Sequence, residues 1–109
     1  MKKLLITFLL LTLSLPIFSQ VELKYFNAGW NAANEIDWID KLTDCKIKKY
    51  DIGSKPADAS EFKVVVVPTI IIFQDGEEVE RYQADISFKM SATREEVQDY
   101  IDELIMSAF

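Results

Sequence analysis

Apolar and polar positions along the first half of the chain change their period twice. Residues 21–26 alternate weakly and are rich in strand formers, and residues 45–52 return to the same character. Between them, from Trp30 or Asn31 to Leu42, apolar residues recur at the spacing of one helix face. The pattern therefore predicts a strand, a helix and a second strand.

The second half of the chain predicts a short helix, two strands and a long helix. Pro56 suits the first turn of a helix that runs to about Phe62. Residues 64–73 are apolar on both faces, as in a strand covered from both sides, although Pro68 divides them. The sequence Gln74-Asp75-Gly76-Glu77 then predicts a hairpin turn into a return strand over residues 79–83.

The last helix carries the clearest pattern of the chain. Thr93 and Glu96 form a capping box, and an apolar stripe follows at Val97, Tyr100, Ile101, Leu104 and Ile105. The complete order is strand, helix, strand, short helix, strand, strand, helix. We therefore expect an α/β fold, βαβ-αββα, with one four-stranded mixed sheet and helices on both faces.

The N-terminal segment has the organisation of a secretory signal peptide. Met1-Lys2-Lys3 is a short basic region, and residues 4–18 are almost entirely apolar, with Pro16 near the end. A membrane-spanning helix needs about 20 apolar residues, so an anchor is the less suitable interpretation. We expect residues 1–20 to be a signal peptide cut near Ser19 or Gln20. Residues 21–109 then form one exported domain, periplasmic or secreted, with no membrane contact after cleavage.

Charge and residue types narrow the possible functions. Removal of the leader takes Lys2 and Lys3 but no acidic residue, so the net charge goes from −6 to −8. Nucleic acids and anionic membranes select basic surfaces, and they are therefore not expected as partners. The chain has no histidine, which excludes Ser-His-Asp and Cys-His catalysis. With no carboxylate cluster at ligand spacing either, we expect no metal site and no cofactor.

Cys45 is the single cysteine, so no disulfide can form within the chain. A lone cysteine at this position suits a small buried hydrophobe. The alternative is an intermolecular disulfide that would link two copies of the chain through Cys45.

Pro68 lies inside the most apolar run of the chain, where a proline removes a sheet hydrogen bond. Its retention there suggests a special backbone, and we expect a cis Val67-Pro68 bond. The motif Val67-Pro68-Thr69, the following Phe73-x-x-Gly76, and the stretch Phe26-Asn27-Ala28-Gly29-Trp30 together resemble the thioredoxin family. The resemblance covers nearly all of the domain, which lacks the extra N-terminal strand and helix of full thioredoxins. It implies the minimal thioredoxin-like fold.

The departures from that family concern its chemistry. Asn31 and Asn34 occupy the positions of the two redox cysteines, and Tyr25 occupies the position of the buried acid. An amide is neither a nucleophile nor a redox centre, so disulfide exchange has no attacking sulfur at this position. Asn31 could cap a helix N-terminus, or both asparagines could hydrogen-bond a bound peptide.

Three functions remain from these observations. The first is a non-catalytic domain that binds an extended peptide or protein in the groove beside the proline. The family resemblance places that groove at Trp30, Asn31, Asn34, Val66, Val67 and Pro68, with no catalytic residue. The second is a divergent relative of thiol-disulfide oxidoreductases that uses Cys45 or the thiol of a partner. The third is a structural subunit of an assembly.

Overall fold

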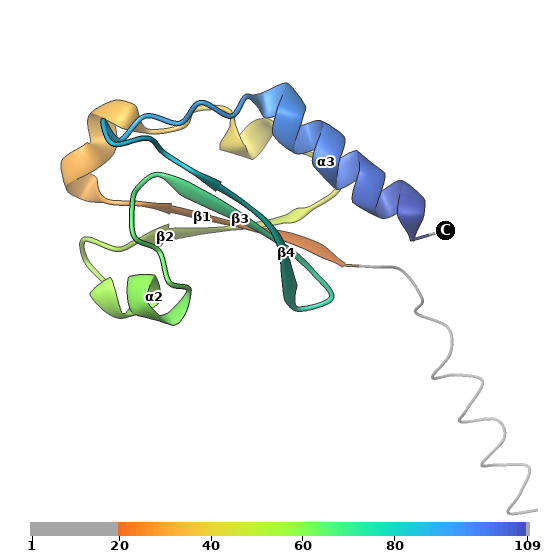
Figure 1. Cartoon of the computed structure of the whole chain (residues 1–109), viewed down its shortest axis with the longest axis horizontal. Helices are drawn as coiled ribbons and strands as arrows, with labels where there is room; N and C mark the ends of the chain where they lie inside the picture. The colour runs from red at the N-terminus through yellow and green to blue at the C-terminus, as the bar shows by residue number, and fades with distance from the viewer. Residues whose placement is uncertain (1–19, 109) are drawn as a thin grey trace, which may run out of the picture.

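The computed structural model describes residues 20–108, so the predicted signal peptide lies outside the described residues except for Gln20. Four strands form one sheet in the order β2-β1-β3-β4 (Figure 1). They are β1 (Val21–Asn27), β2 (Lys46–Asp51), β3 (Thr69–Gln74) and β4 (Glu77–Gln83). β1 is parallel to β2 and antiparallel to β3, which in turn is antiparallel to β4. The predicted mixed four-stranded sheet is confirmed.

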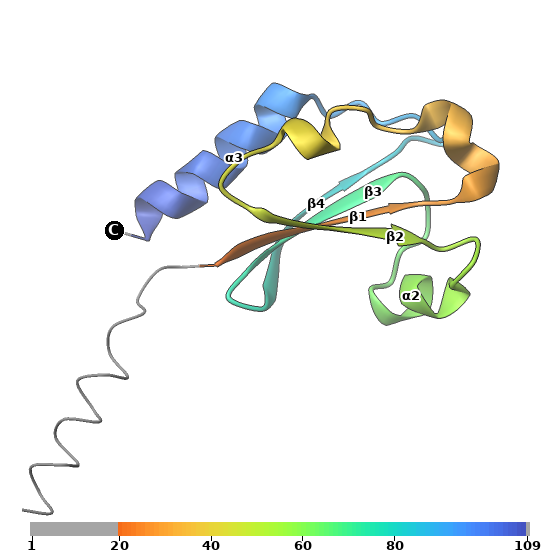
Figure 2. The ribbon, with the colours of Figure 1, turned by 180° about the vertical axis from the view of Figure 1, so that it is seen from behind.

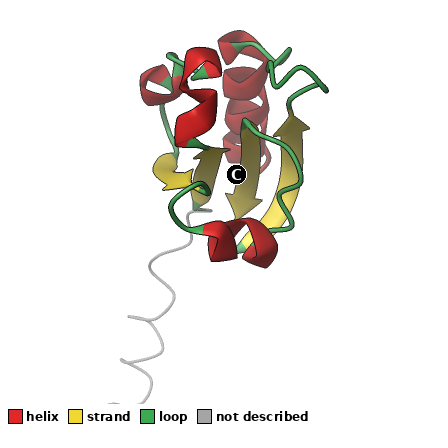
Figure 3. Ribbon diagram, turned by 90° about the vertical axis from the view of Figure 1, so that its left-hand side faces the viewer, coloured by secondary structure: helices red, strands yellow, loops and turns green. Residues whose placement is uncertain are grey.

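Helices cover both faces of this sheet, as predicted. The helix α3 (Arg94–Ser107) lies on one face, and the short helix α2 (Pro56–Glu61) lies on the other (Figures 1 and 2). The view in Figure 3 shows the three layers, with the sheet between the helices.

Among the helices described in residues 20–108, none is long and apolar enough to cross a membrane.

Two groups of buried side chains hold the layers together. On the α3 face, Leu23, Ile70, Ile72, Val97 and Ile101 are all fully buried. On the α2 face, a smaller group is centred on Phe26 and Ile71. The apolar stripe of the last helix therefore faces the sheet as its spacing predicted, and the Thr93 hydroxyl caps this helix by accepting a hydrogen bond from the Glu96 N–H (3.1 Å).

The helix predicted from Trp30 or Asn31 to Leu42 is wrong. The segment forms two short 3-10 helices, η1 (Gly29–Asn34) and η2 (Ile39–Lys41), with residues 35–38 between them. The Ile36 N–H donates to the Tyr25 hydroxyl (3.0 Å) instead of continuing a helical ladder, and Glu35 has an extended backbone. A bond from the sheet therefore ends the helix after the six residues of η1.

The predicted strand over residues 64–73 is also wrong in its first half, because β3 begins only at Thr69. Residues 64–67 are irregular, and the Val64 N–H is bound by the Ala59 carbonyl of α2 (2.8 Å). In this segment Val64 and Val67 are buried while Val65 is 84% exposed. The two ends of the segment, Val64 and Val67, are therefore packed into the protein, whereas Val65 between them faces solvent.

Candidate functional site

The sheet brings η1 and the Pro68 segment together at one end. Phe26, near the end of β1, pairs with Thr69 at the start of β3. Because the two strands are antiparallel, the chain that leaves β1 lies beside the chain that enters β3. Asn27 and η1 are thus placed next to Val67 and Pro68, whose peptide bond is cis.

A polar network connects these two segments. The Asn31 side-chain amide donates to the Asn27 Oδ1 atom (3.1 Å) and, at 3.4 Å, to the Val67 carbonyl. The Asn31 Oδ1 atom accepts from Asn34 (2.9 Å), and the Asn27 amide donates to the Glu35 carboxylate (2.7 Å). Asn27 and Asn31 are each only 5% exposed. The network therefore satisfies two buried amides that would otherwise be costly.

The interpretation of Asn31 as a helix N-cap is wrong, because η1 begins after Ala28 and has no side-chain cap. Both polar atoms of the Asn31 side chain are bonded within the protein. Asn34, by contrast, is only half-buried. A direct contact of either asparagine with a peptide stays a prediction.

Tyr25 adjoins this network and is 2% exposed. Burial, together with the charge of the nearby Glu35 carboxylate, raises the pKa of the Tyr25 hydroxyl to about 12. The phenol therefore stays neutral at physiological pH and does not serve as a proton acceptor. Its bond to the Ile36 N–H gives it a structural task instead.

Apolar side chains surround the open part of the site. Trp30 is 65% exposed and contacts Phe88 edge to face, with ring centroids 5.4 Å apart. These two rings, Ile52 and residues 64–67 line a cavity of about 90 Å³. Sequence analysis missed Phe88, because it lies in the irregular loop over residues 84–93, where no periodic pattern marks a residue as functional.

The backbone of the Pro68 segment carries unused donors. Within residues 20–108, the N–H groups of Val65, Val66 and Val67 donate to no protein acceptor. The Val66 carbonyl accepts from the Thr69 hydroxyl (2.6 Å), whereas the Val65 carbonyl accepts nothing from the described chain. Backbone groups of this kind are normally paired, so the segment resembles an open sheet edge.

Cys45 lies away from this site. It precedes β2, whose residue Lys46 pairs with Glu22 near the start of β1, whereas Asn27 ends β1. Cys45 is one residue before Lys46, so it lies about six residue steps along the sheet from Asn27, a distance of about 20 Å. Cys45 is half-buried against the α3-side core, and burial, with the Asp44 charge, raises the pKa of its thiol to about 11. Both position and protonation argue against a catalytic thiol.

In the described part of the chain, no three histidine, cysteine, aspartate or glutamate side chains are grouped as metal ligands would be. The site therefore consists of an amide network, an aromatic pair and open backbone. Such an arrangement can bind a chain segment.

Comparison with known proteins gives local sequence matches and a match over the whole fold. No protein-family model matches the chain. The chain is 40% identical to a thioredoxin of Mycobacterium tuberculosis over 42 residues and 46% identical to one of Chlamydia trachomatis over 41 residues. Each match covers 38% of this chain, and the chain spans only 36% and 40% of the length of these relatives.

Solved structures extend the likeness to most of the domain. A point mutant of thioredoxin from Halobacterium salinarum superimposes with a TM-score of 0.63 at 27% identity, over 79% of this chain and 75% of that one. Thioredoxin 1 from Thermosipho africanus gives 0.60 at 22% identity, over 80% of this chain and 97% of that one, which is a likeness of fold alone. The chain therefore has a thioredoxin-like fold and local sequence similarity to thioredoxins, and its single cysteine leaves it without a Cys-x-x-Cys pair.

Proposed function

We propose that this chain is an exported, non-catalytic thioredoxin-like domain that binds an extended peptide or protein segment beside Pro68. The observation that carries the proposal is the row of N–H groups at Val65, Val66 and Val67, which have no acceptor within residues 20–108 and lie next to the exposed Trp30 ring. Backbone donors and an exposed aromatic ring are what a bound strand requires.

A bound strand would pair with residues 65–67 through the backbone. Because backbone groups alternate in direction along an extended segment, its carbonyl groups would accept from the N–H groups of Val65 and Val67, and one of its N–H groups would donate to the Val65 carbonyl. One of its side chains would enter the cavity between Trp30 and Phe88, whose rings are already in contact and lose little freedom on binding. Backbone bonds would supply register and affinity, and the aromatic pair would select an apolar side chain.

The amide network supports binding by fixing the walls of the groove. Asn31 links η1 to the Val67 carbonyl, so Trp30, its neighbour in sequence, is held at a constant distance from the Pro68 segment. Where redox thioredoxins carry two cysteines, this chain has a hydrogen-bonded support. A role as an oxidoreductase through Cys45 is not favoured, because that thiol is about 20 Å away along the sheet and has a raised pKa.

Selection from a phage-displayed peptide library, followed by calorimetric titration of the enriched peptides, tests the binding function. Trp30→Ala should weaken binding about 30-fold or more, as expected for a central aromatic contact worth about 2 kcal/mol. Met106→Ala is the matched control, because Met106 is 76% exposed on α3 and outside the groove. Equal affinities of the two variants, or no enriched peptide at all, would contradict the proposal.

The backbone part of the proposal has a separate test. Replacing the peptide amide whose carbonyl faces the Val67 N–H with an ester weakens that acceptor, and we expect about a 2- to 12-fold loss of affinity. The same replacement outside the paired stretch should leave the affinity unchanged.

Turnover in an insulin-reduction assay that disappears in Cys45→Ser would overturn the non-catalytic assignment.

A further inference from the structure

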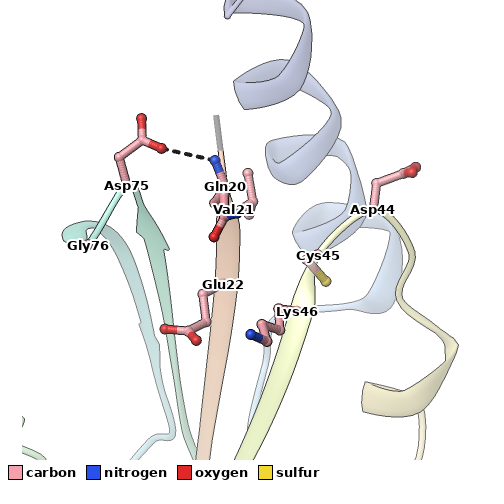
Figure 4. A pocket seen from close by; sticks show the side chains of 8 residues that line it. All are labelled: Gln20, Val21, Glu22, Asp44, Cys45, Lys46, Asp75 and Gly76. Atoms are coloured by element: carbon pink, nitrogen blue, oxygen red, sulfur yellow. Dashed lines mark hydrogen bonds between the residues drawn. The ribbon is translucent and has the colours of Figure 1, made fainter. Parts of the chain in front are cut away.

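Gln20, the first residue that the structure describes, is joined to the turn between β3 and β4 by two reciprocal bonds (Figure 4). The Gln20 N–H donates to the Asp75 carboxylate at Oδ1 (2.9 Å), and the Asp75 N–H donates to the Gln20 carbonyl (2.9 Å). The second bond continues the ladder in which Val21 pairs with Gln74. The first is a side-chain bond that the sheet itself does not require.

The turn fixes the direction of the Asp75 side chain. Asp75 and Gly76 both have positive φ angles, +53° and +87°, as in the two-residue turn that matches the twist of a hairpin. Because the turn is short and bonded on both sides, its carboxylate is held against the backbone nitrogen of Gln20 rather than free in solvent. The position of an acceptor for this one nitrogen is thus built into the hairpin.

A carboxylate forms a charge-assisted hydrogen bond with an amide N–H, and it gains a charge–charge attraction as well when the nitrogen carries a positive charge. Only hydrolysis of the Ser19–Gln20 peptide bond places a positive charge on the nitrogen that already contacts Asp75. We propose that the leader is removed between Ser19 and Gln20, and that Asp75 then binds the α-ammonium group of Gln20. This inference rests on the proposed export and is independent of the peptide groove.

The same contact has a chemical consequence for the new N-terminus. An N-terminal glutamine cyclises when its neutral α-amine attacks Cδ of its own side-chain amide: the N–Cδ bond forms, the Cδ–Nε2 bond breaks, and ammonia leaves with the proton lost by the amine. An amine bound to the Asp75 carboxylate is held in its protonated form, which has no lone pair for the attack on Cδ. Asp75 therefore protects the free amine of Gln20 against conversion to pyroglutamate.

The surroundings supply a matched control. Gln20, Asp75 and Gly76 line an open cavity of about 720 Å³, to which Glu22, Asp44 and Lys46 also contribute (Figure 4). Asp44 is an acid on this cavity, yet within residues 20–108 only Asp75 has a bond to the Gln20 nitrogen. Asp44→Asn thus removes the same charge from the same cavity and leaves the contact intact.

The full chain with its own leader is expressed in an exporting bacterial host, and the intact mass of the exported protein identifies its first residue. We expect Gln20. Wild type, Asp75→Asn and Asp44→Asn are then incubated at neutral pH, and the loss of one ammonia is followed by mass spectrometry. Asp75→Asn should cyclise about two- to fivefold faster than the other two, the range expected for an exposed ion pair.

The outcomes separate the two proposals. Equal cyclisation of Asp75→Asn and wild type, or a mature protein that begins elsewhere than Gln20, would overturn the role of Asp75 and leave the peptide groove untouched. A chain that keeps its leader would overturn the proposed export and this inference with it. Because Asp75 is exposed, Asp75→Asn is expected to fold, and a circular dichroism spectrum matching the wild type verifies this before the rates are compared.

Discussion

Asn31→Asp tests whether the amide network stabilises the protein, because it keeps the shape of the side chain and removes its donor. In the wild type this donor serves the Asn27 Oδ1 atom and the Val67 carbonyl. The variant places a carboxylate there, and two acceptors then face each other at a residue that is 5% exposed. The Asn34 bond survives, since Asn31 accepts in that pair.

The expected loss follows from the bonds that are broken. A hydrogen bond contributes about 0.5–1.5 kcal/mol, and a buried acceptor left without a donor costs about 1–3 kcal/mol. We expect the free energy of unfolding at pH 7 to fall by about 2–4 kcal/mol. For a domain of this size, the melting temperature should fall by roughly 10–30 °C.

The loss should depend on pH in a definite direction. Burial raises the folded-state pKa of the new carboxyl group above its unfolded value of about 3.9. At pH below the unfolded value the group is protonated and can donate to Asn27, so the variant approaches wild-type stability. As pH rises through and beyond the unfolded value, the unfolded state ionises more readily than the folded one, and the variant loses stability relative to the wild type.

Urea unfolding at several pH values measures both effects. Asn34→Asp is the comparison, because it removes a donor at the half-buried edge of the same network, where water can replace the lost bond. It should cost less than about 1 kcal/mol. If Asn31→Asp costs no more than Asn34→Asp, or if its cost is the same at all pH values, the network does not stabilise the fold.

The remaining predictions concern four other features of the chain. Native Cys45 should react with iodoacetamide at pH 8 about tenfold more slowly than a free cysteine, because its raised pKa leaves less thiolate; reaction at the rate of an unfolded control would show that the thiol is accessible and ionised. The pKa of Tyr25 is about 10 in the unfolded chain and about 12 in the folded protein, so its contribution to stability is lost as the pH rises through this range. Tyr25→Phe should therefore lower the free energy of unfolding by about 1 kcal/mol at pH 7 and reduce the loss of stability at alkaline pH. An alkaline unfolding curve identical to that of the wild type would contradict this. Thr93→Ala should cost about 1 kcal/mol in thermal unfolding through loss of the α3 cap, and a smaller effect in Thr93→Ser than in Thr93→Ala identifies the hydroxyl as the cause. Asn31→Cys combined with Asn34→Cys should form a disulfide under mild oxidation, measured as a loss of free thiols. The variant should still reduce insulin poorly, because the short η1 offers little helix dipole to lower a thiol pKa. Full turnover in the insulin assay would refute that reason.

Local patterns predicted the parts of the fold that depend on local rules. The Asp75-Gly76 turn follows from the positive φ angles that such a hairpin needs, and the Thr93 cap follows from helix geometry. The buried stripe of α3 follows from apolar spacing alone. In each case the residues that decide the structure are neighbours in sequence.

The first helix was wrongly predicted because a distant residue decides it. Its apolar spacing is helical, but the Tyr25 hydroxyl on β1 takes the Ile36 N–H, and this competition is visible only when the chain is folded. The site shows the same limit. Asn31 and Asn34 stood out from the family motif, whereas Asn27 and Glu35, which complete the network, carried no sequence signal beyond being polar residues near it.

The η1 segment, which carries Trp30 at the groove, is held by few regular backbone hydrogen bonds. Bonds of the 3-10 type, such as the one from Glu35 to Ala32, have poorer geometry than α-helical bonds, and residues 35–38 interrupt them. Amide hydrogens there should exchange with solvent well before those of β1 and β3, because local opening breaks few bonds. A ligand seated against Trp30 would slow that exchange across the whole segment. Binding of a ligand in the groove should therefore be detectable as reduced motion of η1 and residues 35–38.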